Sequence, residues 1–324
     1  MAITKLQQLA LDVYQGKSVM FNEVSGEEAI RNAIKKAVGG EWNYYNFKKN
    51  RYDVYAILSE VLSLPIQASI EGIFDGLVGV EYIPLGDKKI YDVENPDLFK
   101  VAKVAKGNSD IRRQRIINKQ VEVSTDAFEI KIYEDLDRFI AGRVDFAKLI
   151  QKVYKSMAND TATKISSTIF GSYSKLNSTY GVKGTFDEAK MDDLIAHVEA
   201  KTGMRVALYG TKKALGKVAS AVVSDSQKET YSQLGHYGVY KGTDMITLPQ
   251  VHTNGTDTFA IPDDIVLVLP VGMEIVKVVY EGEPIIDDAQ DWSKRNDRQI
   301  EFMFAFNMGM AVLVANFYGM YDID

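Results

Sequence analysis

Short runs of apolar residues at helical spacing, separated by turn residues, fill the first 77 positions of the chain. Ser25 and Glu28 form a capping-box pattern that predicts a helix through Ile34, stopped by the glycine pair at 39–40. A similar stripe predicts another helix over residues 52–64. Short helices bury too little apolar surface to be stable alone. Residues 1–77 are therefore expected to form an arm that packs on another part of the molecule or on another subunit.

A much longer helical periodicity runs from Glu134 to Ile169. The acidic residues Glu134 and Asp135 would lie in its first turn, where the helix dipole favours negative charge, and Gly171 would end it. About 35 residues correspond to roughly 50 Å of helix at ~1.5 Å per residue. The pattern predicts a long spine helix across which other elements pack.

The pattern changes to that of an α/β unit over residues 185–262. Met191, Leu194 and Val198 share one helical face, Gly203 stands where a helix C-cap belongs, and a buried strand and a second helix follow. The next loop is rich in glycine and tyrosine, as protruding contact loops often are. Its candidate contact residues are Tyr231, His236, Tyr237 and Tyr240.

Extended structure is predicted on both sides of these helices. Residues 78–119 contain extended runs broken by glycine and proline, which indicate a long hairpin. Residues 263–324 contain fully apolar runs and, over 299–306, large apolar residues at every second position. The sequence Asn307–Met310 is interpreted as the turn of a hairpin between two closing strands.

Composition limits the classes of function open to the chain. It contains no cysteine and three histidines, which excludes disulfides and thiol nucleophiles and argues against a histidine-rich metal centre. No segment reaches the ~18 to 20 apolar residues of a membrane span, and the N-terminus lacks a signal-peptide core. We expect a protein made in a reducing cytosol, with no membrane partner.

Charge is distributed unevenly along the chain. The net charge is −6, but residues 98–119 carry seven basic residues against Asp110, a local charge of +6, which leaves −12 for the remainder. This segment is a solvated hairpin, a nucleic-acid contact without the aromatic residues that stack bases, or an arm that lies on the acidic body of an identical neighbour. We favour the third interpretation. The candidate contact residues are Lys100, Lys103, Lys106, Arg112, Arg113, Arg115 and Lys119.

The sequence contains no recognisable catalytic motif. Phosphate-binding loops, dinucleotide turns, the Gly-x-Ser-x-Gly elbow and His-Glu-x-x-His are absent. The densest acidic cluster lacks the alternation and central glycine of a calcium loop, so we interpret it as a solvated or salt-bridging contact loop. No catalytic residue, cofactor or metal is predicted. The acidic cluster comprises Glu281, Glu283, Asp287, Asp288 and Asp291.

The order of these elements resembles that of the major capsid proteins of tailed bacteriophages, which have the Hong Kong 97-type fold. That order is helical arm, basic hairpin, long helix, α/β insert and closing β segment. The strand over 121–129 leading into the helix from Glu134 is similar to that family's entry to its spine helix. Residues 297–317 are similar to its final strands. The resemblance spans nearly the whole chain and rests on element order rather than on an invariant motif.

The resemblance implies an α+β capsid fold with five parts. It also implies a structural protein of the virion that self-assembles, in the bacterial cytoplasm, into the pentamers and hexamers of an icosahedral shell around packaged double-stranded DNA. The DNA would be enclosed without sequence-specific binding. The five parts are an N-terminal arm (1–77), an extended loop (78–119), a peripheral domain with the spine helix (120–184), an axial domain (185–262) and the closing β segment of the peripheral domain (263–324).

Other partners follow from the same resemblance. The arm reaches the hairpin within about eighty residues, which favours a separate scaffolding protein over a fused one, and portal and head-completion proteins are expected as well. Some relatives crosslink subunits through a lysine and an asparagine. Because no asparagine can be paired with the lysines of the loop, we expect no crosslink here.

Three other functions remain open at the level of sequence. An encapsulin-like compartment shares the fold and would enclose a cargo protein instead of DNA. A tail-tube or other virion structural protein would also lack catalytic motifs, although tubes seldom need so long a helix. An enzyme with a diffuse active site would be favoured only if the purified protein bound a small ligand or metal.

Overall fold

The computed structural model describes most of the chain. The described residues are 20–21, 24–41, 43, 45–57, 73–74, 76–94, 99–104, 113–114, 117–135, 146–218, 225–288, 299–312 and 318–324.

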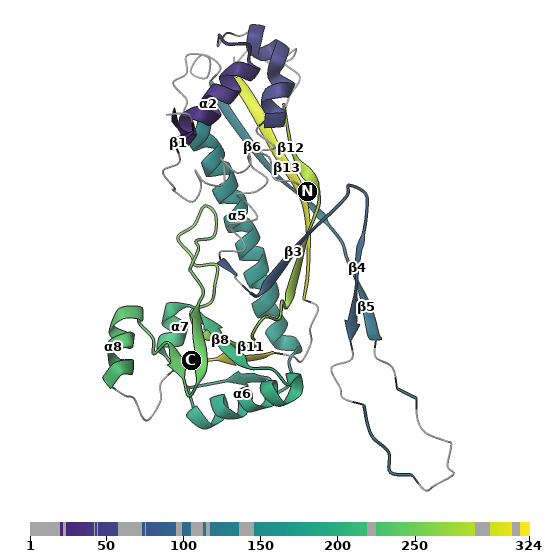
Figure 1. The fold of residues 1–324 in the computed structure, drawn as a ribbon, viewed down its shortest axis with the longest axis vertical. Helices are drawn as coiled ribbons and strands as arrows, with labels where there is room; N and C mark the ends of the chain where they lie inside the picture. Colours follow the sequence, from purple (N-terminus) through teal and green to yellow (C-terminus); the bar gives the residue numbers. More distant parts are fainter. Residues whose placement is uncertain are drawn as a thin grey trace.

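The molecule is elongated, with a long helix at its centre and a projecting hairpin (Figure 1). The central helix is α5 (Phe146–Gly171), which is followed by a short 3-10 helix, η1 (Ser172–Lys175). One sheet of long strands runs beside α5, with the arm helices at the same end, and a second sheet with other short helices lies at the opposite end of the molecule. The hairpin leaves the body near the middle and runs beside it, apart from both sheets, toward the end that carries the second sheet.

The first sheet has four strands in the order β3-β12-β13-β6. β12 (Val276–Asp288) pairs in parallel with β3 (Val78–Ile83) and antiparallel with β13 (Gln299–Val312), which pairs antiparallel with β6 (Asp126–Asp135). Alternate residues of β12 and β13 point towards α5, and the apolar residues of this face and of the helix form one core cluster. This cluster includes Met157, Ile165, Val278, Phe304 and Phe306.

The second sheet has six strands in the order β7-β14-β11-β8-β10-β9. Its central strands are fully apolar, and a second core cluster fills the space between it and α6 (Glu188–Thr202). Two shorter helices accompany it, α7 (Lys212–Gly216) and α8 (Asp225–Leu234). The strands are β7 (Gly181–Lys183), β8 (Val206–Gly210), β9 (Val239–Tyr240), β10 (Thr243–Thr247), β11 (Ile265–Pro270) and β14 (Gly319–Asp322).

The described part of the N-terminal arm is largely helical. β1 (Met20–Phe21) pairs with β2 (Val24–Ser25), and α2 (Gly26–Ala37) follows at once and ends before two glycines of positive φ. Residues 45–57 form another helix. Both predicted helices are confirmed in these parts, and Ile34, Val38, Val54 and Tyr55 belong to the core cluster that contains α5.

The spine helix is real, but the prediction placed its start too early. Glu134 and Asp135 end strand β6, where they pair with Ile300 and Gln299, instead of forming the first helical turn. α5 has 26 residues, about 39 Å at ~1.5 Å per residue. The predicted end at Gly171 is confirmed.

The prediction for the closing β segment, residues 263–324, is wrong about its turn and incomplete about the sheets to which its strands belong. Asn307–Met310 do not form a turn, because β13 continues through them and pairs with β12 on one side as far as Val312. Residues 263–324 also do not belong to one sheet. Their first and last strands, β11 and β14, lie in the six-stranded sheet, whereas β12 and β13 form the centre of the four-stranded one.

Candidate subunit interface

The projecting hairpin consists of β4 (Lys89–Glu94) and β5 (Ile117–Val123). They pair antiparallel, with Lys89 opposite Val123 and Tyr91 opposite Val121. An ion pair between Lys88 Nζ and a carboxylate oxygen of Glu122, 2.5 Å, links the two strands near their base. The hairpin projects from the body apart from both sheets (Figure 1), whereas the other described two-stranded pair, β1–β2, contacts helix α2.

Beyond the paired strands the two arms of the hairpin loop are joined by a glutamine side chain. The Gln114 amide oxygen accepts the Lys100 backbone N–H at 2.8 Å, and the Gln114 amide nitrogen donates to the Lys100 carbonyl oxygen at 3.0 Å. This pair of bonds reproduces the pattern of two paired strands. The loop therefore stays a two-armed structure at least as far as residue 100.

Apolar and basic side chains alternate along the outgoing arm of the loop. Val101 is 97% exposed and Phe99 is 54% exposed, and Val104 is also exposed, with Lys100 and Lys103 between them. Burying one such apolar side chain is worth about 1.5–3 kcal/mol. A loop that offers both apolar and basic groups to solvent is suited to contact a surface that is partly apolar and partly acidic.

Only some of the seven basic residues predicted to make the contact are seen to be exposed in the structure. Lys100, Lys103 and Arg113 are exposed on the loop, and Lys119 lies in strand β5 opposite Val93. Lys106, Arg112 and Arg115 lie outside the described residues. The sequence interpretation missed Phe99, Val101 and Gln114, although the run Phe-Lys-Val-Ala-Lys-Val already shows the alternation.

The predicted acidic contact loop is a strand instead. Glu281, Glu283, Asp287 and Asp288 lie in β12, and Asp291 lies outside the described residues. Strand β12 carries a bulge between Glu281 and Ile285. Glu281 does not face solvent freely, because its carboxylate accepts the Gly86 backbone N–H at 2.7 Å and a hydrogen bond from the Thr125 hydroxyl.

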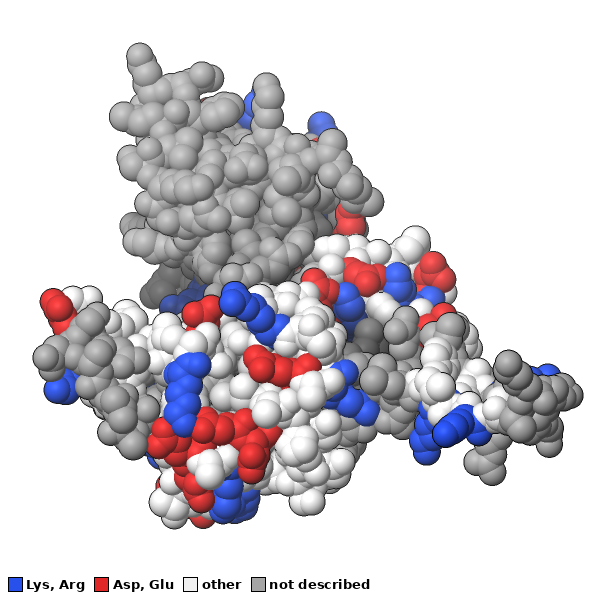
Figure 2. Space-filling model, turned by 60° about the horizontal axis from the view of Figure 1, so that its bottom comes forward, with Lys and Arg blue, Asp and Glu red and all other residues white. Residues whose placement is uncertain are grey.

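Other acidic side chains are gathered on the part of the body that carries the six-stranded sheet (Figure 2). On α6, Glu188 and Asp192 lie 2.7 and 2.5 Å from the Lys241 Nζ. Lys241 has a φ of 47° in the two-residue turn between β9 and β10. Its ion pairs to α6 hold the turn in this left-handed conformation, which is unfavourable for a residue other than glycine.

The four residues of the predicted axial contact loop divide into two pairs. Tyr231 and Tyr237 have ring centroids 4.9 Å apart, and Tyr231 is exposed. His236 and Tyr240 are only 3% and 2% exposed. The prediction is therefore wrong for the side chains of His236 and Tyr240, which pack inside the subunit. Residue Tyr231 also belongs to helix α8, not to a loop.

The buried His236 holds this region together as a neutral imidazole. The Gly238 backbone N–H donates to His236 Nδ1 at 3.0 Å, and His236 Nε2 lies 2.8 Å from the Thr247 hydroxyl oxygen. An accepting Nδ1 requires the proton on Nε2. Burial, and then the positive charge of Lys212, lower the pKa of His236 below its ordinary value.

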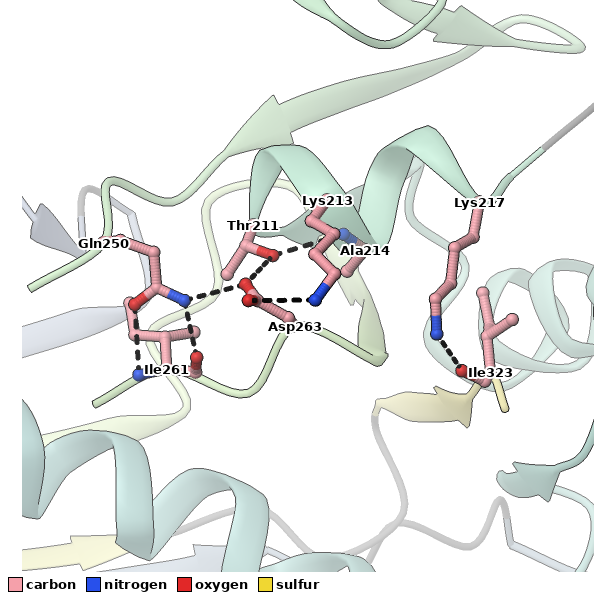
Figure 3. A network of polar contacts seen from close by, with 8 residues as sticks. All are labelled: Thr211, Lys213, Ala214, Lys217, Gln250, Ile261, Asp263 and Ile323. Atoms are coloured by element: carbon pink, nitrogen blue, oxygen red, sulfur yellow. Dashed lines mark hydrogen bonds and ion pairs between the residues drawn. The ribbon is translucent and has the colours of Figure 1, made fainter. Parts of the chain in front are cut away.

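A polar network centred on Asp263 fixes α7 to the segment that precedes β11 (Figure 3). Asp263 Oδ1 accepts from the Thr211 hydroxyl at 2.9 Å and from the Gln250 amide at 2.9 Å. Thr211 is the N-cap of α7 and accepts the Ala214 N–H at 3.2 Å. Burial raises the pKa of Asp263, but the bonds from Gln250 and Thr211 and the charge of Lys213 outweigh it, so the pKa is lowered overall.

No group of three or more histidine, aspartate or glutamate side chains in the described ranges is placed to hold a metal ion. None of the helices described here has the length and apolar character needed to cross a membrane.

Comparison with known proteins gives a match over nearly the full length. A family model described as "SPbeta prophage-derived putative capsid protein YonB" matches residues 5–322. No curated protein sequence matches the chain at a significant level.

Solved structures match over most of their own length at low identity. A capsid chain of bacteriophage PhiM1 is 10% identical, with 77% of this chain and 86% of that chain covered and a TM-score of 0.53. The virus-like particle from Pyrococcus furiosus is 14% identical, with coverages of 81% and 98% and a TM-score of 0.47. A chain of Microbacterium phage Oxtober96 is 9% identical, with coverages of 76% and 89% and a TM-score of 0.48. At such identity the PhiM1 match shows a shared fold.

Proposed function

The chain belongs to the YonB family of prophage-derived capsid proteins, and on that premise we propose that its copies join through the projecting hairpin loop into the pentamers and hexamers of the shell. The predicted Hong Kong 97-type α+β fold and the function of major capsid protein in the virion of a tailed phage are confirmed. The contacts between copies are the part that the proposal adds.

The loop of the hairpin supplies the apolar and basic side of the contact. Val101 and Phe99 are exposed, and the exposed Lys100, Lys103 and Arg113 on the same loop add positive charge. The rest of the chain carries the compensating negative charge. Apolar burial would supply most of the affinity, and the exposed charge pairs, worth ~0.2 to 1 kcal/mol each, would set register and partner choice.

The other predicted parts keep their proposed roles with the corrections given above. The six-stranded sheet with α6, α7 and α8 would be the axial domain, with the Tyr231–Tyr237 ring pair near its contacts around the five-fold and six-fold axes. The four-stranded sheet and α5 would form the peripheral domain. We propose the arm (1–77) as a further contact between subunits.

The proposal also covers partners and the absence of catalysis. A separate scaffolding protein, a portal and head-completion proteins would act during assembly, and DNA would be enclosed without sequence-specific contacts. We propose that the chain is not an enzyme and needs no cofactor. An encapsulin-like role, with a protein cargo, is the second candidate; the content of the purified shell, DNA or protein, separates the two.

Charge reversal on the loop tests the proposed contact. The variant Lys100→Glu, Lys103→Glu, Arg113→Glu should remain folded as a monomer and fail to form shells in negative-stain microscopy, because repulsion replaces attraction at the neighbour. The control Lys152→Glu, Lys155→Glu, Lys190→Glu changes three exposed lysines of the body and the net charge by the same amount. Normal shells from the loop variant would contradict the proposal.

A further inference from the structure

One carboxylate, that of Glu281, contacts both connections at the root of the hairpin. Glu281 stands at the bulge of β12, where the register with β13 shifts. One of its oxygens, Oε1, accepts the Gly86 backbone N–H at 2.7 Å, and the other, Oε2, accepts the Thr125 hydroxyl. Residues Gly86 and Thr125 are 195 and 156 positions away from Glu281 in the chain.

These two contacts fall on the two segments that connect the hairpin to the body. Gly86 lies in the turn that leads from β3 into β4, with the Asp87 N–H bonded to the Pro84 carbonyl at 3.1 Å. Thr125 lies in the short link that leads from β5 into β6. Glu281 therefore binds the chain where it enters the hairpin and again where it leaves.

The surroundings fit a carboxylate that is kept ionised. The hydrogen bond from Thr125, and then the one from the Gly86 backbone, lower the pKa of Glu281 below its ordinary value. Leu85 lies beside Gly282, the residue that follows Glu281 in the chain. The φ of Gly282, 71°, is a backbone conformation that glycine adopts far more readily than other residues. Across the same turn, Lys89 Nζ lies 2.5 Å from a carboxylate oxygen of Glu81, so β3 and β4 are also linked directly.

We propose that Glu281 is a positioning residue that clasps both connections of the hairpin and fixes the angle at which the hairpin leaves the body. A hairpin tied to the body at one connection can pivot about it, whereas ties at both connections oppose that rotation. The position of the loop relative to α5 is then set inside the subunit, before any neighbour binds. That this angle matters for shell assembly rests on the proposed function.

The absence of cysteine in the chain permits a direct test by spin labelling. Val101→Cys on the loop and Lys152→Cys on α5 place one label on each side of the clasp, both at exposed positions. Pulsed electron spin resonance on the unassembled protein should give one narrow distance peak. Adding Glu281→Ala should abolish the narrow peak, and Glu281→Gln should restore it in part, because its amide oxygen still accepts the Gly86 N–H.

Two further variants make the test specific. Glu283→Ala, two positions along the same strand and exposed, should leave the peak unchanged. Thr125→Val removes one of the two contacts with little change in shape and should broaden the peak even if Glu281→Ala does not fold. An unchanged narrow peak in folded Glu281→Ala, or in Thr125→Val, would overturn the clasp.

The same variants separate the clasp from the proposed function. A broadened peak together with failed shell assembly supports both. A broadened peak with normal shells supports the clasp and contradicts the role of the hairpin as the contact between subunits. Because the distances are measured on the unassembled protein, they do not depend on any neighbour.

Discussion

Replacing Gly309 with alanine is predicted to destabilise the subunit at the root of the hairpin. Gly309 lies in β13 opposite Val279, just beyond the last pair between β13 and β6. A Cβ at this position would lie 2.3 Å from the Ser124 carbonyl oxygen and 2.8 Å from a methyl carbon of Val123. Both obstacles belong to the segment through which the chain leaves the hairpin, and the first is a backbone atom.

The size of the effect follows from this geometry. Real Cβ atoms essentially never approach closer than 3.0 Å, so β13 and the link at Ser124 must separate by at least 3.0 − 2.3 = 0.7 Å. Val123 is buried, so the movement also disturbs packed side chains. Overpacking of this kind costs about 1–3 kcal/mol. For a chain of this size, that corresponds to a fall in Tm of a few degrees.

Thermal unfolding of the unassembled subunit, followed by circular dichroism, measures the effect. The matched control is Gly171→Ala at the end of α5, where an added Cβ meets nothing within 4 Å and the backbone is helical. Alanine is favoured over glycine inside a helix by up to ~1 kcal/mol, so the Tm of the control should stay the same or rise. A Gly309→Ala variant as stable as the natural protein would refute the close approach of β13 and residue 124.

Two further predictions concern the six-stranded sheet. Asp263→Ala should lower the free energy of unfolding by about 1–3 kcal/mol in urea titrations, because it leaves the Thr211 and Gln250 donors without their acceptor; an unchanged urea midpoint would contradict the network. The lowered pKa of Asp263 stabilises the fold above pH 3.8, and this contribution should be lost as the pH falls from 3.8 through the folded pKa, more steeply than in the Ala variant. The lowered pKa of His236 means that the fold favours the neutral ring, so stability should fall as the pH drops below 6.5. In His236→Gln this dependence should be weaker, and an identical pH profile in the two proteins would show that His236 does not titrate with folding.

Local signals in the sequence predicted the helices whose ends are capped. Helix α6 begins after Asp187, whose side chain accepts the Ala189 N–H at 2.9 Å, and ends at Gly203 with a φ of 66°. The buried positions Met191, Leu194 and Val198 are those of the predicted apolar face. Such features lie within a few residues of one another, so they are visible in the sequence before any tertiary contact is known.

Errors occurred where distant pairing decides the structure. The alternation of Phe128, Ile130 and Ile132 with exposed residues marks β6 as a strand, yet the acidic residues that end it were taken for the first turn of the helix. Gly309 was interpreted as part of a turn, whereas it allows a close approach to a segment about 185 positions away. The bulge of β12 leaves no pattern in the nearby sequence. The same holds for the two distant partners of Glu281, Gly86 and Thr125.

The candidate interface was predicted only as a charge pattern. The basic segment could be found by counting the charged residues of 98–119. The exposure of Lys100 and Lys103 is consistent with a contact made by this segment. The role of Glu281 could not, because a carboxylate in an acidic run looks the same whether it faces solvent or accepts two hydrogen bonds. The burial of His236 and Tyr240 depends on partners in β10 and α6, Thr247 and Asp192 respectively, which no short sequence window around the two residues contains.

Cryo-electron microscopy of shells assembled from the purified protein tests the central claim most directly. The account predicts closed icosahedral shells of pentamers and hexamers, in which density for residues 99–104 of each subunit lies on the body of an adjacent copy. Shells in which this loop contacts no other subunit, or a protein that stays monomeric with its scaffolding partner present, would contradict it.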